Sequence, residues 1–108
     1  MNRQVLSTED KIRGFAARQP GWCYRGGDGF AANTIESAIQ IEKNMREIGI
    51  LETDAFPGPE GEIRVTAYCG ADYYEFTVNP NLVVEYIHEQ NKTEIDTAEL
   101  SVQDALRK

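Results

Sequence analysis

The feature of this sequence that most constrains its fold is a change of hydrophobic spacing at Gly49. Before this glycine, apolar residues recur every three or four positions, which is the period of an α-helix. After it, β-branched and aromatic residues alternate with polar ones, which is the period of a strand with one buried face. The chain is therefore predicted to place helices first and an antiparallel sheet second, as α+β proteins do.

Two helices are predicted in the first half of the chain. The first spans about residues 8–18, and Pro20 follows it as a stop signal. The second spans residues 34–48 and is the clearer of the two, because Asn33 or Thr34 can serve as its N-cap and a glycine follows its last turn.

Glu42 falls inside the broad apolar face of the second helix. A buried carboxylate is unfavourable unless it is paired. Two interpretations stay open: Glu42 lies near a seam and turns its carboxylate to water, or it is half-buried beside an arginine or an aromatic hydroxyl. No other charge in this helix needs such an explanation.

Four strands are predicted after the helices, over residues 50–56, 62–69, 72–79 and 82–88. Short turns rich in Gly, Pro and Asn separate them, so consecutive strands are expected to pair as an antiparallel β-meander. The predicted core face of the middle strands carries Ile63, Val65, Ala67, Cys69, Tyr74, Phe76 and Val78. The opposite face carries Arg64, Thr66, Tyr68, Tyr73, Glu75 and Thr77.

A chain of 108 residues is expected to form one domain. Its predicted segments are an N-terminal helix within 1–19, an aromatic and glycine loop at 20–33, a main helix at 34–49, a β-meander at 50–88, and a polar loop with a short helix at 89–108. Both N-terminal helices are expected to pack on one face of the four-stranded meander. The predicted fold is thus α+β with a short C-terminal helix.

The charge balance bears on the kind of partner. Lys and Arg number 11 and Asp and Glu number 18, so the formal net charge is -7. Such a charge repels a phosphate backbone and removes the counterion release that drives nucleic-acid binding, so direct binding to DNA or RNA is disfavoured. The charge either keeps a small protein soluble or steers it toward a basic protein partner, and the sequence leaves both interpretations open.

The predicted location is the cytoplasm. The first ten residues lack the apolar core of a secretory signal, and no stretch is long and apolar enough to span a membrane. Cys23 and Cys69 are then expected to be reduced thiols, because their separation matches neither a redox pair nor a zinc cluster. Cys69 is further expected to be buried on the core face of the sheet.

The stretch PGWCYRGGDGFAANTIE, at residues 20–36, contains the pattern G-x-G-x-x-A ahead of a helix. A dinucleotide site would also need a preceding parallel strand, and the carboxylate of Asp28 would repel phosphate. Two interpretations remain for this loop. Either the rings of Trp22 and Tyr24 hold it in place, or these rings and Arg25 anchor a protein interface.

No catalytic, metal or cofactor site is predicted. A nucleophilic cysteine would need His88 beside it, and the sequence gives no sign of that proximity. One histidine, two distant cysteines and scattered carboxylates fit no zinc or calcium motif. The sequence therefore offers a surface for function and no reaction centre.

Aromatic and charged side chains on the outer face of the sheet suit a partner footprint, although an ordinary solvated face has the same composition. The predicted partner-binding residues are Trp22, Tyr24, Arg25, Asp28, Arg64, Tyr68, Tyr73, Glu75 and Glu85. If Val83 and Ile87 also lie on this face, its apolar area favours a protein partner or a homodimer.

Three segments carry a resemblance: GWCYRGG at 21–27, MREIG at 45–49 and FPGPEGEI at 56–63. Over residues 20–88 the chain resembles small, functionally uncharacterised bacterial or phage α+β proteins, in which an aromatic and glycine loop precedes one helix and a PG-x-x-G turn opens a meander. Cys23 stands where a second aromatic residue is expected. The resemblance implies a bacterial or phage setting and no catalytic residue.

Two functions follow as hypotheses. The first is a non-enzymatic, acidic interaction module, such as an antitoxin, an immunity protein or a phage-encoded anti-defence inhibitor, that occludes a basic partner. The second is a small-ligand-binding or enzymatic domain with a site near Trp22 and Glu42.

Overall fold

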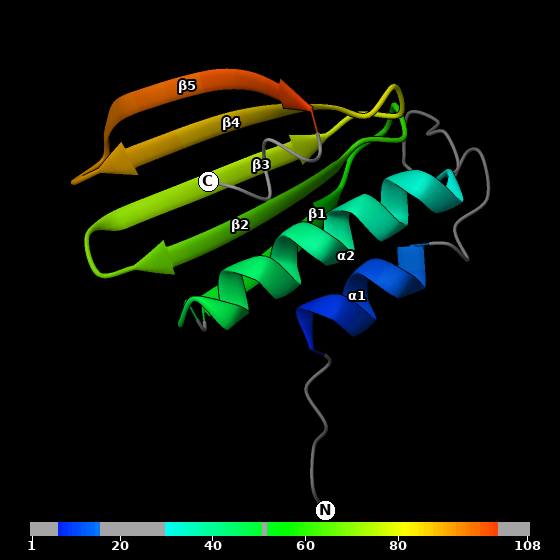
Figure 1. Ribbon diagram of the computed structural model, residues 1–108, viewed down its shortest axis with the longest axis horizontal. Helices are drawn as coiled ribbons and strands as arrows, with labels where there is room; N and C mark the ends of the chain where they lie inside the picture. The colour runs from blue at the N-terminus through cyan, green and yellow to red at the C-terminus, as the bar shows by residue number, and fades with distance from the viewer. Residues whose placement is uncertain (1–6, 16–29, 51, 102–108) are drawn as a thin grey trace, which may run out of the picture.

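The computed structural model describes residues 7–15, 30–50 and 52–101, which form two helices and one five-stranded sheet (Figure 1). The helices are α1 (Thr8–Gly14) and α2 (Ala32–Glu47). The strands are β1 (Glu52–Pro57), β2 (Ile63–Cys69), β3 (Asp72–Val78), β4 (Val83–Gln90) and β5 (Thr93–Ser101). Each strand pairs antiparallel with the next, in the order β1-β2-β3-β4-β5. The predicted α+β class is confirmed.

The two helices begin differently. Ser7 caps α1, and its hydroxyl accepts a hydrogen bond from the Asp10 amide at 3.1 Å. The N-cap of α2 is Ala31, which supplies no side-chain hydrogen bond. The prediction that Asn33 or Thr34 caps α2 is therefore wrong, because both residues lie inside its first turn.

The helix ends also differ. The α-helical part of α1 ends at Gly14, short of the predicted end, and residues 16–18 lie outside the described residues. The end of α2 follows the prediction. Gly49 has a φ of 100°, and the Ile50 amide donates to the Met45 carbonyl at 3.0 Å, which is the Schellman arrangement that glycine permits.

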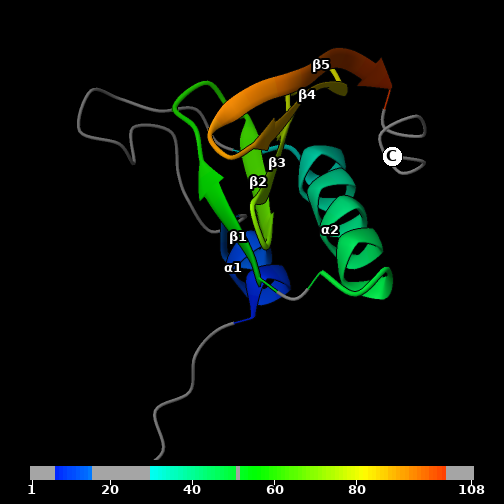
Figure 2. The ribbon, with the colours of Figure 1, turned by 90° about the vertical axis from the view of Figure 1, so that its left-hand side faces the viewer.

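Both helices lie on the same side of the sheet, and we call that side the helix face (Figure 2). There α1 packs against β1, and α2 lies over β2 and β3. The buried apolar residues are Ile12, Phe15, Ile35, Ala38, Ile39, Ile41, Met45, Ala55, Ile63, Val65, Ala67, Phe76, Val78, Val84 and Tyr86. The predicted core positions Ile63, Val65, Ala67, Phe76 and Val78 are among them.

Cys69 is the exception, since its thiol is free and exposed. The prediction that it is buried is wrong. Alternation does place it on the helix face, but it is the last residue of β2 and borders the two-residue turn formed by Gly70 and Ala71. Burial at a strand end depends on a neighbouring layer, which alternation alone does not report.

The predicted C-terminal organisation is wrong for the described residues. The sequence predicts a polar loop with a short helix over residues 89–108. The chain instead forms β5, which pairs with β4 from Thr93 to Ser101 with one bulge at Ile95. Residues 102–108 lie outside the described residues.

The turn before β5 explains the difference. Asn91 and Lys92 have φ values of 52° and 66°, so they form the two-residue hairpin turn that matches the twist of paired strands. Asn adopts this conformation more readily than most residues, but Lys is an unusual substitute for Gly. Ala98 and Leu100 then turn inward and pack against the core.

Candidate functional site

No described helix covers the side of the sheet opposite the helix face, which we call the open face (Figure 2). Strand alternation and pairing decide which side chains it carries. Among these, Arg64 is the one basic residue. They are Glu52, Asp54, Phe56, Arg64, Thr66, Tyr68, Tyr73, Glu75, Thr77, Val83, Glu85, Ile87, Glu89, Glu94, Thr97, Glu99 and Ser101.

The predicted residues Arg64, Tyr68, Tyr73 and Glu75 come together on β2 and β3. Tyr68 and Tyr73 are directly opposite, and their ring centroids are 4.9 Å apart. The Tyr73 hydroxyl donates to Glu75 Oε1 at 2.8 Å, and Arg64 Nε lies 3.8 Å from Glu75 Oε2. Burial, followed by this bond to Glu75, raises the pKa of Tyr73, so its phenol stays protonated and keeps donating.

Exposed aromatic surface borders this group. The side chains of Tyr68 and Phe56 are 54% and 44% exposed. Tyrosine and phenylalanine rings supply large contact areas with few rotatable bonds. The centre of the open face can therefore contact a partner through rings held by a fixed polar group.

The acidic end of the open face lies on β4 and β5. The predicted residue Glu85 is directly opposite Glu99, and Glu89 is directly opposite Glu94. Like charges in directly opposed positions destabilise a sheet. Arg64 belongs to β2, with β3 between it and β4, so it does not neutralise these pairs. Lys92, in the turn between β4 and β5, lines the same hollow as Glu89, so the pair without a neighbouring described lysine is Glu85 and Glu99.

The remaining predicted partner-binding residues are Trp22, Tyr24, Arg25 and Asp28. They lie outside the described residues, so their contribution stays a prediction.

Glu42 has a structural role that the sequence left open. Its side chain is 1% exposed, so the carboxylate does not turn to water. Arg46 Nε lies 2.9 Å from one of its oxygens and 2.8 Å from the other. The Thr53 hydroxyl donates to Oε2 at 2.8 Å. The interpretation of a paired acid is therefore correct, with a threonine hydroxyl in place of an aromatic one.

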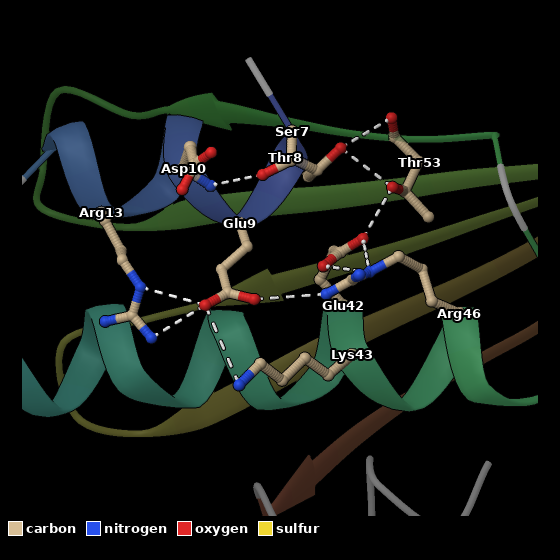
Figure 3. A network of polar contacts seen from close by, with 9 residues as sticks. All are labelled: Ser7, Thr8, Glu9, Asp10, Arg13, Glu42, Lys43, Arg46 and Thr53. Atoms are coloured by element: carbon tan, nitrogen blue, oxygen red, sulfur yellow. Dashed lines mark hydrogen bonds and ion pairs between the residues drawn. The ribbon is translucent and has the colours of Figure 1, made fainter.

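Glu42 belongs to a network that joins α1, α2 and β1 (Figure 3). Glu9 on α1 accepts from Arg13 at 2.9 Å and lies 3.3 Å from Arg46, which also contacts Glu42. The hydrogen bond from Arg13, supported by the charges of Lys43 and Arg46, lowers the pKa of Glu9 against the opposing effect of desolvation. The Thr8 hydroxyl donates to the Thr53 carbonyl at 3.0 Å and thus joins α1 directly to β1. This network holds elements together and leaves no carboxylate oxygen of Glu42 free for a ligand.

His88 lies on the helix face, where its Nε2 is 3.0 Å from Asp72 Oδ1. Its ring stacks on Tyr74 with centroids 4.4 Å apart. The ring is thus held by a carboxylate and an aromatic face, as in many structural histidines. In the described part of the chain, no three His, Cys, Asp or Glu side chains converge as metal ligands would.

An apolar cleft lies between the end of α2 and strands β3 and β4. Its lining includes Met45, Ile48, Tyr74, Phe76 and Tyr86. Its described lining contains no carboxylate, histidine, lysine or arginine, and burial raises the pKa of both the Tyr74 and the Tyr86 phenol, so they stay protonated.

Sequence reasoning missed Glu94 and Glu99, because their segment was expected to be loop and helix. A signal was present. The β-branched residues Thr93, Ile95 and Thr97 alternate with other residues just after an asparagine that tolerates positive φ.

Neither helix in the described part of the chain is long and apolar enough to cross a membrane. Comparisons with protein-family models, with curated proteins and with solved structures gave no match.

Proposed function

We propose that this chain is a non-enzymatic protein that binds a basic protein partner through its open face. The observation that carries the proposal is the opposition of Glu85 to Glu99 and of Glu89 to Glu94. Such pairs weaken the isolated sheet, whereas opposite charges at these positions would each contribute about 0.2–1 kcal/mol. A basic surface docked on β4 and β5 converts this repulsion into attraction.

The neighbouring side chains supply apolar contact area, which a purely charged surface lacks. Phe56 and Tyr68 offer exposed rings, and the bond from Tyr73 to Glu75 fixes the geometry beside them. Acidic residues accelerate encounter with a basic partner, and aromatic residues slow its dissociation.

Occlusion of a basic protein surface is the action expected of an antitoxin, an immunity protein or a phage-encoded inhibitor. We propose these classes, acting in the cytoplasm of a bacterium or of a phage-infected cell. Nucleic acid is a poor partner for the same face, because phosphate would meet carboxylates.

The alternative, a ligand or catalytic site near Trp22 and Glu42, has less support. Both oxygens of Glu42 already have hydrogen-bond partners inside the protein. Binding a ligand there would break the contacts that join α1, α2 and β1.

The proposal is tested by charge reversal on the open face. The wild-type chain, Glu85→Lys/Glu89→Lys and the control Glu36→Lys/Glu47→Lys are immobilised and exposed to a bacterial lysate. The control changes net charge equally, at exposed positions of α2. Captured proteins are quantified by mass spectrometry at about 50 and about 500 mM salt, because screening weakens surface electrostatics.

We expect the wild type and the control to retain the same basic proteins at low salt and to release them at high salt. The Glu85→Lys/Glu89→Lys variant should lose them. Equal capture by all three chains would show that the open face is not the binding surface. Equal loss in both variants would show that only total charge matters, which would also contradict the proposal.

A further inference from the structure

The two edge strands of the sheet, β1 and β5, differ in whether their outward backbone N–H and C=O groups already make hydrogen bonds. In an antiparallel ladder, hydrogen-bonded pairs alternate with pairs whose N–H and C=O groups point away from the neighbouring strand. The Gly58 amide donates to the Glu62 carbonyl at 2.8 Å, in register with β1 and β2. Every second residue before Gly58, namely Phe56, Asp54 and Glu52, therefore directs its backbone N–H and C=O groups toward β2. The backbone groups of Thr53, Ala55 and Pro57 point away from β2.

The outer edge of β1 is closed. The Thr53 carbonyl accepts from the Thr8 hydroxyl, and the Ala55 amide donates to Asp54 Oδ1 at 2.8 Å. Lys11 Nζ, 2.6 Å from the same carboxylate oxygen, holds Asp54 in place. Pro57 has no N–H to offer. A further strand cannot pair here without breaking these contacts.

Among the described strands, none pairs with the outer edge of β5, which we call open. The Asn79 amide donates to the Val83 carbonyl at 3.1 Å, so alternate β4 residues from Val83 point toward β3. The residues between them point toward β5 and pair with Asp96, Ala98 and Leu100. Thr97 and Glu99 therefore point their backbone groups outward, and β5 pairs with no other described strand (Figure 1).

We propose that β5 receives an extended, basic segment of the partner protein as an added sixth strand. This inference rests on the proposed function for the charge of the partner and adds the way in which the partner docks. Main-chain hydrogen bonds at Thr97 and Glu99 supply affinity, as in other complexes formed by strand addition. Ile95, at a bulge in the strand, is 52% exposed and offers an apolar contact beside the edge.

The charges of β5 select the occupant. The strand carries Glu94, Asp96 and Glu99 and contains no Lys or Arg. A second copy of this chain, paired edge to edge, would bring acids against acids, which is how natural sheets prevent self-pairing. A strand with Lys or Arg at every second position places cations beside Glu94 and Glu99.

The test uses a short peptide of alternating Lys and Val and the same peptide with N-methyl groups on alternate amides of its pairing edge. Both carry identical charge, but only the first can form the ladder. Binding is measured by fluorescence anisotropy, and protection of individual amides by hydrogen exchange. The unmethylated peptide should bind at least ten-fold more tightly and should protect the Thr97 and Glu99 amides.

A variant pair examines the same edge from the side of the protein. Thr97→Pro removes an outward N–H that β4 does not use, whereas Thr97→Val keeps it. We expect at least a ten-fold loss of peptide affinity for Thr97→Pro and wild-type affinity for Thr97→Val. If Thr97→Pro does not fold, the peptide comparison with the wild-type chain decides alone.

Equal binding of the two peptides, or protection elsewhere than β5, would overturn strand addition while leaving an acidic docking face intact. Absence of binding by both peptides would also overturn it. The lysate experiment with Glu85→Lys/Glu89→Lys judges the proposed function separately.

Discussion

At the scale of single residues, the side chain of Glu42 shows how this fold accommodates a charge in its core. It is 1% exposed and has hydrogen-bond partners on its own helix and on β1. Removing one partner of a buried charge leaves the charge under-solvated, which destabilises more than the lost bond alone.

Thr53→Val is therefore predicted to reduce the free energy of unfolding by about 1–3 kcal/mol, because valine keeps the shape but cannot donate to the buried carboxylate. Urea unfolding followed by circular dichroism measures the change. Thr77→Val is the matched control, since Thr77 lies on the open face, and it should stay within about 0.5 kcal/mol of wild type. Equal stability of the two variants would contradict the role given to Thr53.

Thr34→Val is predicted to have the opposite effect. The Thr34 side chain is fully buried, and among the described residues its hydroxyl finds no hydrogen-bond partner. Replacing an unpaired hydroxyl with a methyl group should raise the free energy of unfolding by about 1 kcal/mol. The same urea experiment measures it, and a loss of stability would mean that the hydroxyl does make a stabilising contact.

At the scale of elements, carboxylates attach α1 to the rest of the fold. Glu9 contacts Lys43 and Arg46 on α2, and Asp54 on β1 contacts Lys11 on α1. Burial alone would raise the pKa of Asp54, but hydrogen bonds from Lys11 and from the Ala55 amide lower it overall. The pKa of Glu9 is also lowered, chiefly by Arg13.

A lowered folded-state pKa means that the unfolded chain binds protons more readily. The contribution of Glu9 and Asp54 is then present above their unfolded pKa values and is lost as the pH falls through the folded ones. We predict that the melting temperature drops as the pH decreases from about 5 to about 3. Thermal melts across this range measure it.

Asp54→Asn should make this pH dependence shallower, and adding Lys11→Met to that variant should change it no further. If Lys11→Met still alters the pH dependence of the melting temperature in the Asp54→Asn variant, the ion pair between Lys11 and Asp54 is not the cause of that dependence.

The hairpin of β4 and β5 supplies a second prediction at this scale. Glu85→Lys places opposite charges across from each other, so it should raise the free energy of unfolding by about 0.2–1 kcal/mol at low salt. The gain should disappear at about 1 M salt because of screening. A variant no more stable than wild type at low salt would remove the argument that Glu85 is kept for binding. Urea unfolding at both salt concentrations measures this.

The elements differ in how well the sequence predicts them. The middle strands are readable because one face is buried, so Val65 and Phe76 alternate with polar residues. β5 is an exposed edge strand, so its alternating β-branched residues do not divide into a buried and an exposed set, and Lys92 replaces the glycine that usually marks such a turn. Hydrophobic periodicity in a sequence reflects which side chains are buried. An edge strand, which pairs with only one other strand, buries few of its side chains.

The same reasoning explains the candidate site. Arg64, Tyr68, Tyr73 and Glu75 could be grouped from the sequence, because two adjacent strands joined by a tight turn fix their register. The opposition of Glu85 to Glu99 could not be predicted without β5. Which edge of the sheet is closed depends on contacts from α1, which lies far away in the sequence.

At the scale of the whole molecule, charge bears on self-association. The net charge is -7, and the acids of the described open face outnumber its basic residue Arg64 and the two lysines that reach it from outside the strands, Lys11 and Lys92. Two open faces, or two β5 edges, would repel each other. We therefore propose that the exposed rings of Phe56 and Tyr68 contact a different protein and not a second copy of this chain.

We predict that the purified chain is monomeric at about 50 mM salt, where screening is weak. Analytical ultracentrifugation over a range of protein concentrations measures this. A stable dimer at low salt would contradict the prediction and would favour the homodimer that the apolar positions Val83 and Ile87 first suggested.

The closed edge of β1 has a consequence for how far strand pairing can extend. Among the described strands, a molecule that accepts a strand on β5 as proposed keeps no second open edge with which to pair with another copy. We therefore expect growth of the sheet to stop after one addition, so that the chain would end strand pairing and would not repeat as the unit of a fibre.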